Sequence, residues 1–227
     1  MIDRLFDRLD EWRNLPAYQL ERRADMFFSL YLREALEARL GIHLDGTIIP
    51  EFPVRLGDLK EHGLSLKGGD DQSKKIDYVY FSSDRMHAYS VELKTDDASR
   101  KSSQDAYLNA APKIGMPPLI TGLIKIRDKS TQKLKYERLL EKLELLRQVE
   151  KIDGKWKCTS KVHKWQLLYV QPNLKNSDTP DQVITFNWLA DHLEEKHKDD
   201  ALALRFAKSL RKWASVAAGT KQTSQPG

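Results

Sequence analysis

The chain has 227 residues, a formal net charge of +5 and one cysteine. This length can bury a sizeable core without staples, and a single cysteine excludes a disulfide framework and a cysteine-rich zinc site. No apolar run approaches the roughly 20 residues of a membrane span, and the charged N-terminus lacks the apolar stretch of a signal peptide. We therefore expect a cytoplasmic protein with no membrane partner.

The first part of the chain predicts two helices and three strands. A short amphipathic helix is expected over 3–14, and a second helix runs from Leu20 to a glycine stop at Gly41. A strand is expected over 47–54, followed by a loop or short helix over 56–74. Residues 76–81 and 88–94 are rich in β-branched and aromatic residues, and the polar turn 82–85 between them predicts a hairpin.

The second part predicts helices and two further strands. Helices are expected over 98–112, 118–127 and 131–151, then strands over 165–170 and 182–186. Asn187 is the expected cap of a helix over 188–196, and a last helix spans 199–217. We expect one α/β domain over 1–217 with a mixed sheet flanked by helices, and a disordered polar tail over 218–227.

Two carboxylates and a lysine fall within the predicted hairpin. Asp77 is followed, after a gap of fourteen residues, by Glu92-Leu93-Lys94. Asp77 shares its strand face with Val79, so its carboxylate needs an ion pair, a hydrogen bond or a metal. Two hard oxygen ligands on adjacent strands suit Mg²⁺. The alternative is that Asp77 lies on a solvated face and that Glu92 and Lys94 form a weak surface pair.

These residues, in this order of elements, resemble the PD-(D/E)XK nuclease superfamily. The resemblance covers about residues 20–112 and departs at Ile76, where the superfamily name has proline. It implies a restriction-endonuclease-like three-layer core with a central mixed sheet, in which 165–170 is the fourth core strand. It also implies a Mg²⁺ or Mn²⁺ cofactor and hydrolysis of phosphodiester bonds in nucleic acid, with DNA as the expected substrate.

The resemblance assigns roles to the hairpin residues. Asp77 and Glu92 would hold the metal, and the carbonyl oxygen of Leu93 would be a further ligand. Lys94 would orient the attacking water or offset charge on the phosphate. Superfamily members often place Gln and Tyr on the following helix, which implies site roles for Gln104 and Tyr107. Their spacing is one residue shorter than the common one, but both still share a helix face.

Further carboxylates are weaker candidates. Many superfamily members add one from the first core helix, for which Glu21 and Asp25 are preferred over Glu34. Each of these can equally be the polar border of an amphipathic helix, which is the plainer interpretation. Glu51, on the first predicted strand, is a second-tier candidate for a metal or supporting role.

A basic segment predicts contact with phosphates. From Gly122 to Trp165 the chain has 13 Lys or Arg and 6 Asp or Glu, a local net charge of +7. The candidate nucleic-acid contacts are Lys155, Lys157, Lys161 and Lys164, in a predicted lysine-rich loop, and Lys101 near the start of a helix. The alternative is a solvated helix face followed by a solubilising loop.

Two functions therefore follow from the sequence. The first is a metal-dependent nuclease. The second is a catalytically inactive nuclease-fold module that binds nucleic acid or serves as a scaffold. The sequence leaves open whether the chain forms a homodimer.

Overall fold

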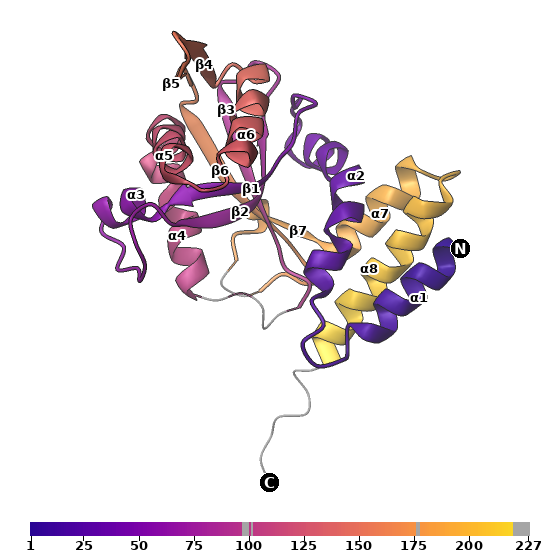
Figure 1. Cartoon of the computed structure of the whole chain (residues 1–227). Helices are drawn as coiled ribbons and strands as arrows, with labels where there is room; N and C mark the ends of the chain where they lie inside the picture. The colour runs from indigo at the N-terminus through magenta and orange to yellow at the C-terminus, as the bar shows by residue number, and fades with distance from the viewer. Residues whose placement is uncertain (97–99, 101, 176–177, 220–227) are drawn as a thin grey trace. The chain divides into compact units, whose positions relative to one another are not determined.

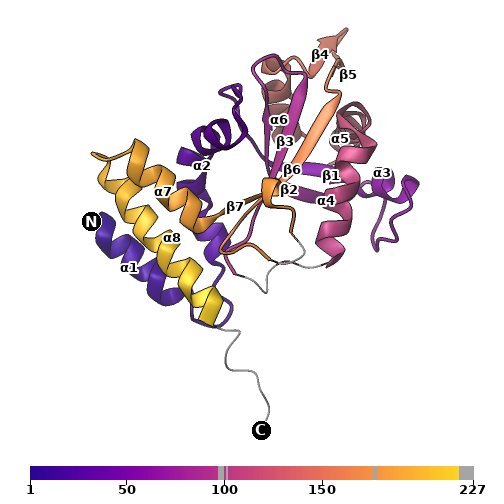
Figure 2. The ribbon, with the colours of Figure 1, turned by 180° about the vertical axis from the view of Figure 1, so that it is seen from behind.

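The computed structural model describes residues 1–96, 100, 102–175 and 178–219, with backbone alone for 216–219. The chain folds into two compact units. Unit 1 takes in 1–41, 93–100 and 168 onward, and unit 2 takes in 42–92 and 101–167. Figure 1 shows the ribbon of both units, and Figure 2 shows it from behind. That 1–217 forms a single domain stays a prediction.

The strands form a mixed sheet with the order β1-β2-β3-β6-β7. Its members are β1 (Ile49–Arg55), β2 (Ser73–Phe81), β3 (His87–Leu93), β6 (Lys164–Gln171) and β7 (Val183–Thr185). The β1–β2 and β2–β3 pairs are antiparallel, whereas β6 and β7 run parallel. This confirms the predicted α/β class, its mixed sheet and the hairpin that carries Asp77 and Glu92.

Unit 2 adds four helices and a separate hairpin to its strands. The helices are α3 (Leu56–Glu61), α4 (Ser102–Ile114), α5 (Met116–Lys129) and α6 (Lys133–Leu145). Helix α5 packs against β1 and buries Leu119, Ile120 and Leu123 completely. The short strands β4 (Val149–Ile152) and β5 (Lys155–Cys158) form the separate two-stranded hairpin.

Unit 1 is a helical cluster with an aromatic core. It contains α1 (Ile2–Trp12), α2 (Leu20–Leu40), α7 (Phe186–Lys196) and α8 (Ala201–Gly219). The rings of Phe28 and Phe206 meet edge to face with centroids 5.1 Å apart. The buried indole of Trp213 donates a hydrogen bond to Asp10 Oδ1 at 2.8 Å, which satisfies its one polar atom. Helix α2 ends as predicted at Gly41, whose φ is +65°.

The predicted helix over 131–151 is wrong in its last third. Helix α6 ends at Leu145, and Arg147 then takes a left-handed conformation with φ of +55°. The chain returns in the β4–β5 hairpin through Asp153 and Gly154, both also left-handed, as a type I′ turn requires. Val149 keeps helical spacing with the leucines before it, but it pairs with Cys158 across the hairpin.

Three other boundaries differ from expectation. Helix α4 spans Ser102–Ile114 and so ends two residues later than predicted; residues 98, 99 and 101 of its predicted start lie outside the described residues. The side chain of Thr185, not Asn187, caps α7 by accepting from the Trp188 N–H at 3.2 Å. Helix α8 continues to Gly219, so residues 218 and 219 of the predicted tail are helical. The rest of that tail, 220–227, lies outside the described residues.

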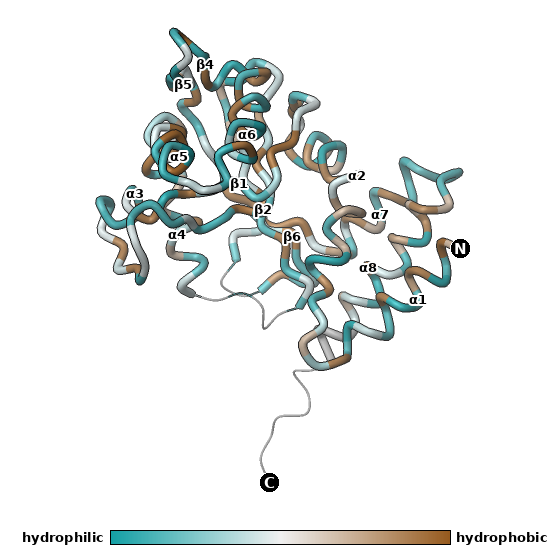
Figure 3. The backbone as a smooth tube through the Cα atoms, viewed as in Figure 1, coloured by the Kyte–Doolittle hydropathy of each residue, from teal (hydrophilic) through white to brown (hydrophobic). Residues whose placement is uncertain are grey.

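Figure 3 shows hydrophobic and hydrophilic residues alternating along the helices. Among the described residues, none of the helices combines the length and the apolar character that a membrane crossing requires.

Candidate functional site

The β2–β3 ladder positions the two predicted metal carboxylates. Tyr78 on β2 lies opposite Val91 on β3, and the two strands are antiparallel. Asp77, which precedes Tyr78, therefore lies opposite Glu92, which follows Val91. Opposing residues of an antiparallel pair project to the same face. Asp77 is half-buried, and Glu92 has an exposed fraction of 0%. Adjacent strands therefore place two carboxylates on one face of the sheet, as predicted.

Helix α4 supplies a donor to the buried carboxylate. The side-chain amide of Gln104 donates a hydrogen bond to Glu92 Oε1. A carboxylate removed from water requires such partners, because burying an unsatisfied charge is costly. Gln104 therefore reaches the position that the sequence predicts, despite the shorter spacing to Tyr107.

Tyr107 lies on the same helix, close to the candidate carboxylates. Its hydroxyl donates to the carbonyl oxygen of Lys75 at 2.9 Å. Burial raises the pKa of Tyr107, and the negative charge of Glu92 raises it further, with smaller contributions from Asp77 and Glu51. The Tyr107 hydroxyl is therefore a hydrogen-bond donor at the edge of an acidic cluster, not a phenolate.

Glu51 joins this cluster from β1. Its neighbours Pro50 and Phe52 pair with Tyr78 and Ile76, so Glu51 lies level with Asp77. Its φ is +51°, a left-handed conformation that costs a non-glycine residue about 1–2 kcal/mol. Glu51 Oε2 lies 2.9 Å from Lys75 Nζ, but both side chains are more than half exposed, so water screens the pair.

Unit 1 contains the predicted lysine and one helix carboxylate near it. Lys94 is 3% exposed, and its backbone N–H donates to the carbonyl oxygen of Val170 at 2.8 Å. Its ammonium lies 3.9 Å from Glu21 Oε2, from the first turn of α2. Asp25, one turn later, accepts a hydrogen bond from the Met26 N–H at 2.7 Å.

Two other residues of unit 1 complete the predicted set. Leu93, between Glu92 and Lys94, is buried. Glu34 lies beside two histidines, with its Oε1 3.0 Å from His197 Nε2 and 3.4 Å from His192 Nε2. Of the three helix carboxylates, the structure places Glu21 beside Lys94 and Glu34 beside the histidines.

The donors present suit a hard divalent cation. No group of three or more His, Cys, Asp or Glu side chains with metal-binding geometry occurs within the described ranges. Mg²⁺ needs fewer protein ligands than that, since it typically binds one or two carboxylates and keeps several waters. Asp77 and Glu92 supply two carboxylates. The carbonyl of Leu93 belongs to β3, the strand that also carries Glu92.

The predicted nucleic-acid contacts are exposed but belong to different elements. Lys155 and Lys157 project from β5, on either side of the buried Trp156, so this segment is a strand and not the predicted loop. Lys161 and Lys164 are also exposed. Lys101 lies outside the described residues.

A cationic groove beside the acidic cluster is not foreseen from the sequence. It has a volume of about 380 Å³ and is lined by Glu51 and Lys75 from the strands and by one face of α6. The cations of that face are Lys135, Arg138 and Lys142, and Tyr136 and Leu139 lie between them. These three cations are three or four residues apart, which places them on one face of a helix. A count of charges along the chain does not register this spacing.

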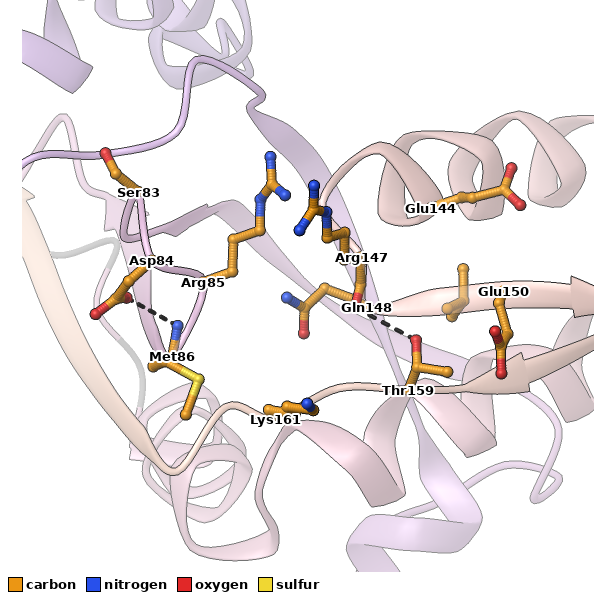
Figure 4. Close-up of a pocket in the computed structure, with 11 residues that line it drawn as sticks. Ser83, Asp84, Arg85, Met86, Glu144, Arg147, Gln148, Glu150, Thr159 and Lys161 are labelled. Atoms are coloured by element: carbon orange, nitrogen blue, oxygen red, sulfur yellow. Dashed lines mark hydrogen bonds between the residues drawn. The ribbon is translucent and has the colours of Figure 1, made fainter.

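A second, larger cavity of about 780 Å³ lies at the far end of the β2–β3 hairpin. Lys161 lines it together with Arg85 and Arg147, and Figure 4 shows these side chains. Some basic residues of unit 2 thus line this cavity, and others line the groove beside α6.

Comparison of the chain with family models, with curated proteins and with solved structures found no match in any of the three.

Proposed function

We propose that the protein is a metal-dependent nuclease of the PD-(D/E)XK type that hydrolyses phosphodiester bonds, with DNA as its substrate. The observation that carries the proposal is the placement of Asp77 and Glu92 at adjacent positions of neighbouring strands, with Gln104 hydrogen-bonded to Glu92. The restriction-endonuclease-like arrangement, with helices on both faces of the sheet, is part of the same proposal.

The proposal gives each residue a distinct task. Asp77 and Glu92 would hold Mg²⁺ or Mn²⁺, which when bound polarises a phosphate oxygen and lowers the pKa of a coordinated water. Gln104 fixes the orientation of the Glu92 carboxylate, as outer partners of metal ligands do. Lys94, two residues after Glu92, would offset charge on the phosphate.

The groove beside Glu51 supports a polyanionic substrate. Three cations on one face of α6 and Lys75 line it, with Tyr136 between them as an aromatic surface. Grooves that bind single nucleic-acid strands combine cations for the phosphates with aromatic side chains on which bases stack. We propose that the substrate strand approaches the carboxylates along this groove.

A cleavage assay tests the proposed function. Wild-type protein is incubated with single-stranded, duplex and branched DNA in Mg²⁺ or Mn²⁺, beside the variant Lys94→Met, which keeps the buried aliphatic stem and removes the charge. Lys208→Met, at an exposed position of α8, controls for the loss of one positive charge. We expect cleavage by wild type and Lys208→Met and none by Lys94→Met, with Mg²⁺ affinity unchanged in all three.

The same assay distinguishes the alternative function. A wild-type protein that binds DNA but neither cleaves it nor takes up Mg²⁺ in calorimetry would be the catalytically inactive binding module. Cleavage by Lys94→Met at the wild-type rate would remove Lys94 from the site and leave the assignment of Asp77 and Glu92 to be tested separately.

A further inference from the structure

Two arginines occupy backbone positions at which glycine is the usual residue. Arg85 lies in the β2–β3 turn with φ of +62°, and its N–H donates to the Ser82 carbonyl at 2.8 Å. Arg147 follows α6 with φ of +55°. Left-handed residues in hairpin turns and after helices are most often glycine, because a Cβ is disfavoured there.

The bonds around Arg147 identify its position in the helix cap. Its N–H donates to the Glu144 carbonyl at 2.8 Å, and the N–H of Gln148 donates to the Leu143 carbonyl at 2.9 Å. These two bonds form the Schellman pattern, in which the left-handed residue needs no side chain. An arginine here lowers the stability of the fold relative to glycine, so its side chain requires another explanation.

Both arginines line the same cavity. The cavity of about 780 Å³ lies between the β2–β3 turn and the connection from α6 to β4, and Lys161 is its third cation. In Figure 4 the guanidinium groups of Arg85 and Arg147 point toward one another. Arg147 is exposed and Arg85 is half-buried, so water screens part of the repulsion between these like charges, and an anion between them would offset the rest.

Among the described residues, no acidic residue that lines the cavity forms an ion pair with either arginine. Asp84 Oδ1 accepts from the Met86 N–H at 2.9 Å and from the Ser82 hydroxyl. Glu144 and Glu150 point away from the two guanidinium groups in Figure 4.

The two arginines differ in their own ion pairs. Arg85 Nη2 lies 3.1 Å from Asp45 Oδ2. Within the part of the chain that the structure describes, no carboxylate lies within 4.0 Å of the Arg147 guanidinium. Arg147 therefore presents a full set of donors to the cavity.

We propose that this cavity binds a phosphate group, held between Arg85 and Arg147 with Lys161 adding positive charge. The planar guanidinium of Arg147 suits phosphate because it can donate two parallel hydrogen bonds. Arg85 donates from Nε and Nη2 to Asp45, so it would contribute its Nη1 group. Asp77 and Phe81 are four residues apart on β2, about 13 Å at roughly 3.3 Å per residue, and the cavity lies beyond Phe81. The bound phosphate is therefore distinct from one at the Asp77–Glu92 pair, and it belongs either to a nucleic-acid backbone or to a free nucleotide.

Glycine substitution at Arg147 makes the inference testable, because it should stabilise the fold while it removes the ligand contact. Arg85→Gly also removes the ion pair with Asp45, so only its binding is compared. Arg147→Gly and Arg85→Gly are compared with Asp153→Gly, which relieves the same backbone conformation at an exposed position of the β4–β5 turn. Lys208→Ala controls for net charge. The probes, all without divalent metal, are inorganic pyrophosphate, a nucleoside triphosphate and a fluorescent DNA strand.

We expect the melting temperature of Arg147→Gly to equal or exceed that of wild type. We also expect at least about tenfold weaker binding of the phosphate probes, the loss typical of a charge-assisted hydrogen-bonded pair. Asp153→Gly and Lys208→Ala should bind as wild type does. Tighter binding of DNA than of the triphosphate assigns the phosphate to a nucleic-acid backbone, and the reverse order assigns it to a nucleotide.

Equal binding of every probe by wild type, Arg85→Gly and Arg147→Gly would overturn the proposal. If Arg147→Gly instead melts at a lower temperature, Arg147→Asn, which tolerates a left-handed backbone, carries the binding comparison. None of these measurements uses metal or cleavage, so a failure of the proposed nuclease function leaves their outcome unchanged.

Discussion

At the scale of single residues, Glu92 shows most directly how burial and hydrogen bonding position a carboxylate. It has an exposed fraction of 0% and accepts a hydrogen bond from Gln104. Removing a carboxylate from water costs free energy of folding, and a glutamine of the same shape would not bear this cost. A functional role would account for the charge at this buried position.

The first prediction concerns the ligand charges. Glu92→Gln and Asp77→Asn keep the side-chain shape and remove the charge, so each should abolish Mg²⁺ binding and cleavage while the fold survives. Calorimetry measures metal uptake, and circular dichroism checks the fold. Unfolding of both variants would indicate a structural role, and full activity in either would contradict the metal assignment.

The second prediction concerns the orientation of Glu92. Gln104→Ala should lower metal affinity or the cleavage rate by about 10–100-fold, the usual effect of removing an outer partner of a metal ligand. Asn109→Ala, at an exposed position of the same helix, is the matched control and should change neither. An unaltered metal affinity and rate in Gln104→Ala would show that the hydrogen bond serves packing alone.

The third prediction follows from the raised pKa of Tyr107. Above pH 10 the unfolded chain loses the phenolic proton, which the folded chain retains, so the free energy of unfolding falls as pH rises through this range. One such group contributes up to about 1.4 kcal/mol per pH unit. In urea titrations between pH 9 and 12, Tyr107→Phe should lose less stability than wild type. Parallel curves for the two proteins would contradict the prediction.

The placement of these residues could be predicted from the sequence because it depends on local regularities. Strand alternation and a hairpin turn are sufficient to bring Asp77 beside Glu92. Helical spacing carries Gln104 and Tyr107 to one face of α4. The left-handed backbone of Glu51 has no such signal, because no glycine or asparagine marks the position.

At the scale of elements, the β4–β5 hairpin shows where sequence periodicity misleads. Leu143, Leu146 and Val149 continue a helical pattern beyond the end of α6, which favours a longer helix. The competing signal is Asp153-Gly154, the dipeptide most typical of a tight hairpin. The hairpin also gains a tertiary interaction, a hydrogen bond from the Trp156 indole to Glu137 Oε2 at 2.6 Å, between residues that no local pattern relates.

The fourth prediction concerns the packing of α3 against α5. Glycine inside a helix normally costs stability relative to alanine, but a Cβ at Gly122 would collide with the Asp58 carboxylate and lie 3.2 Å from Arg55 Cβ. Asp58 is buried and held by Arg55 at 3.1 Å, so it has little room to move. Gly122→Ala should therefore destabilise the protein by about 1–3 kcal/mol.

A double-mutant cycle isolates this packing interaction. Asp58→Ala should cost less in the Gly122→Ala background than in wild type, with a coupling energy of about 1 kcal/mol or more. Gly69→Ala, where a Cβ would meet no atom within 4 Å, is the control and should be nearly neutral. Stabilisation by Gly122→Ala would show that helix propensity outweighs the collision.

At the scale of the whole molecule, the distribution of charge decides how a polyanion would be held. The sequence indicates a basic segment only as a run of charges along the chain. The fold divides it among a groove along α6, the exposed face of β5 and the cavity that Arg147 and Lys161 line. This division could not be predicted from the number of charges, because it depends on which face of α6 lies toward β1.

The fifth prediction separates the two basic surfaces by salt dependence. Replacing Lys135, Arg138 and Lys142 with glutamine should reduce the slope of log affinity for single-stranded DNA against log salt, by up to roughly 0.7 for each phosphate that the variant no longer neutralises. The matched comparison replaces Lys155, Lys157, Lys161 and Lys164 and applies the same measurement. An unchanged slope in the first variant, with a reduced slope in the second, would place the DNA on the surface that the sequence alone favours.

The two edges of the sheet also bear on how copies of the chain can meet. Strand β1 lies at one edge, with prolines at 50 and 53 that supply no N–H donor and a left-handed Glu51 between them. Strand β7, at the other edge, has only three residues. Short, proline-interrupted edges resist the addition of another strand. The sheet is thus a poor template for edge-to-edge polymerisation, and a homodimer would have to be built from side-chain surfaces.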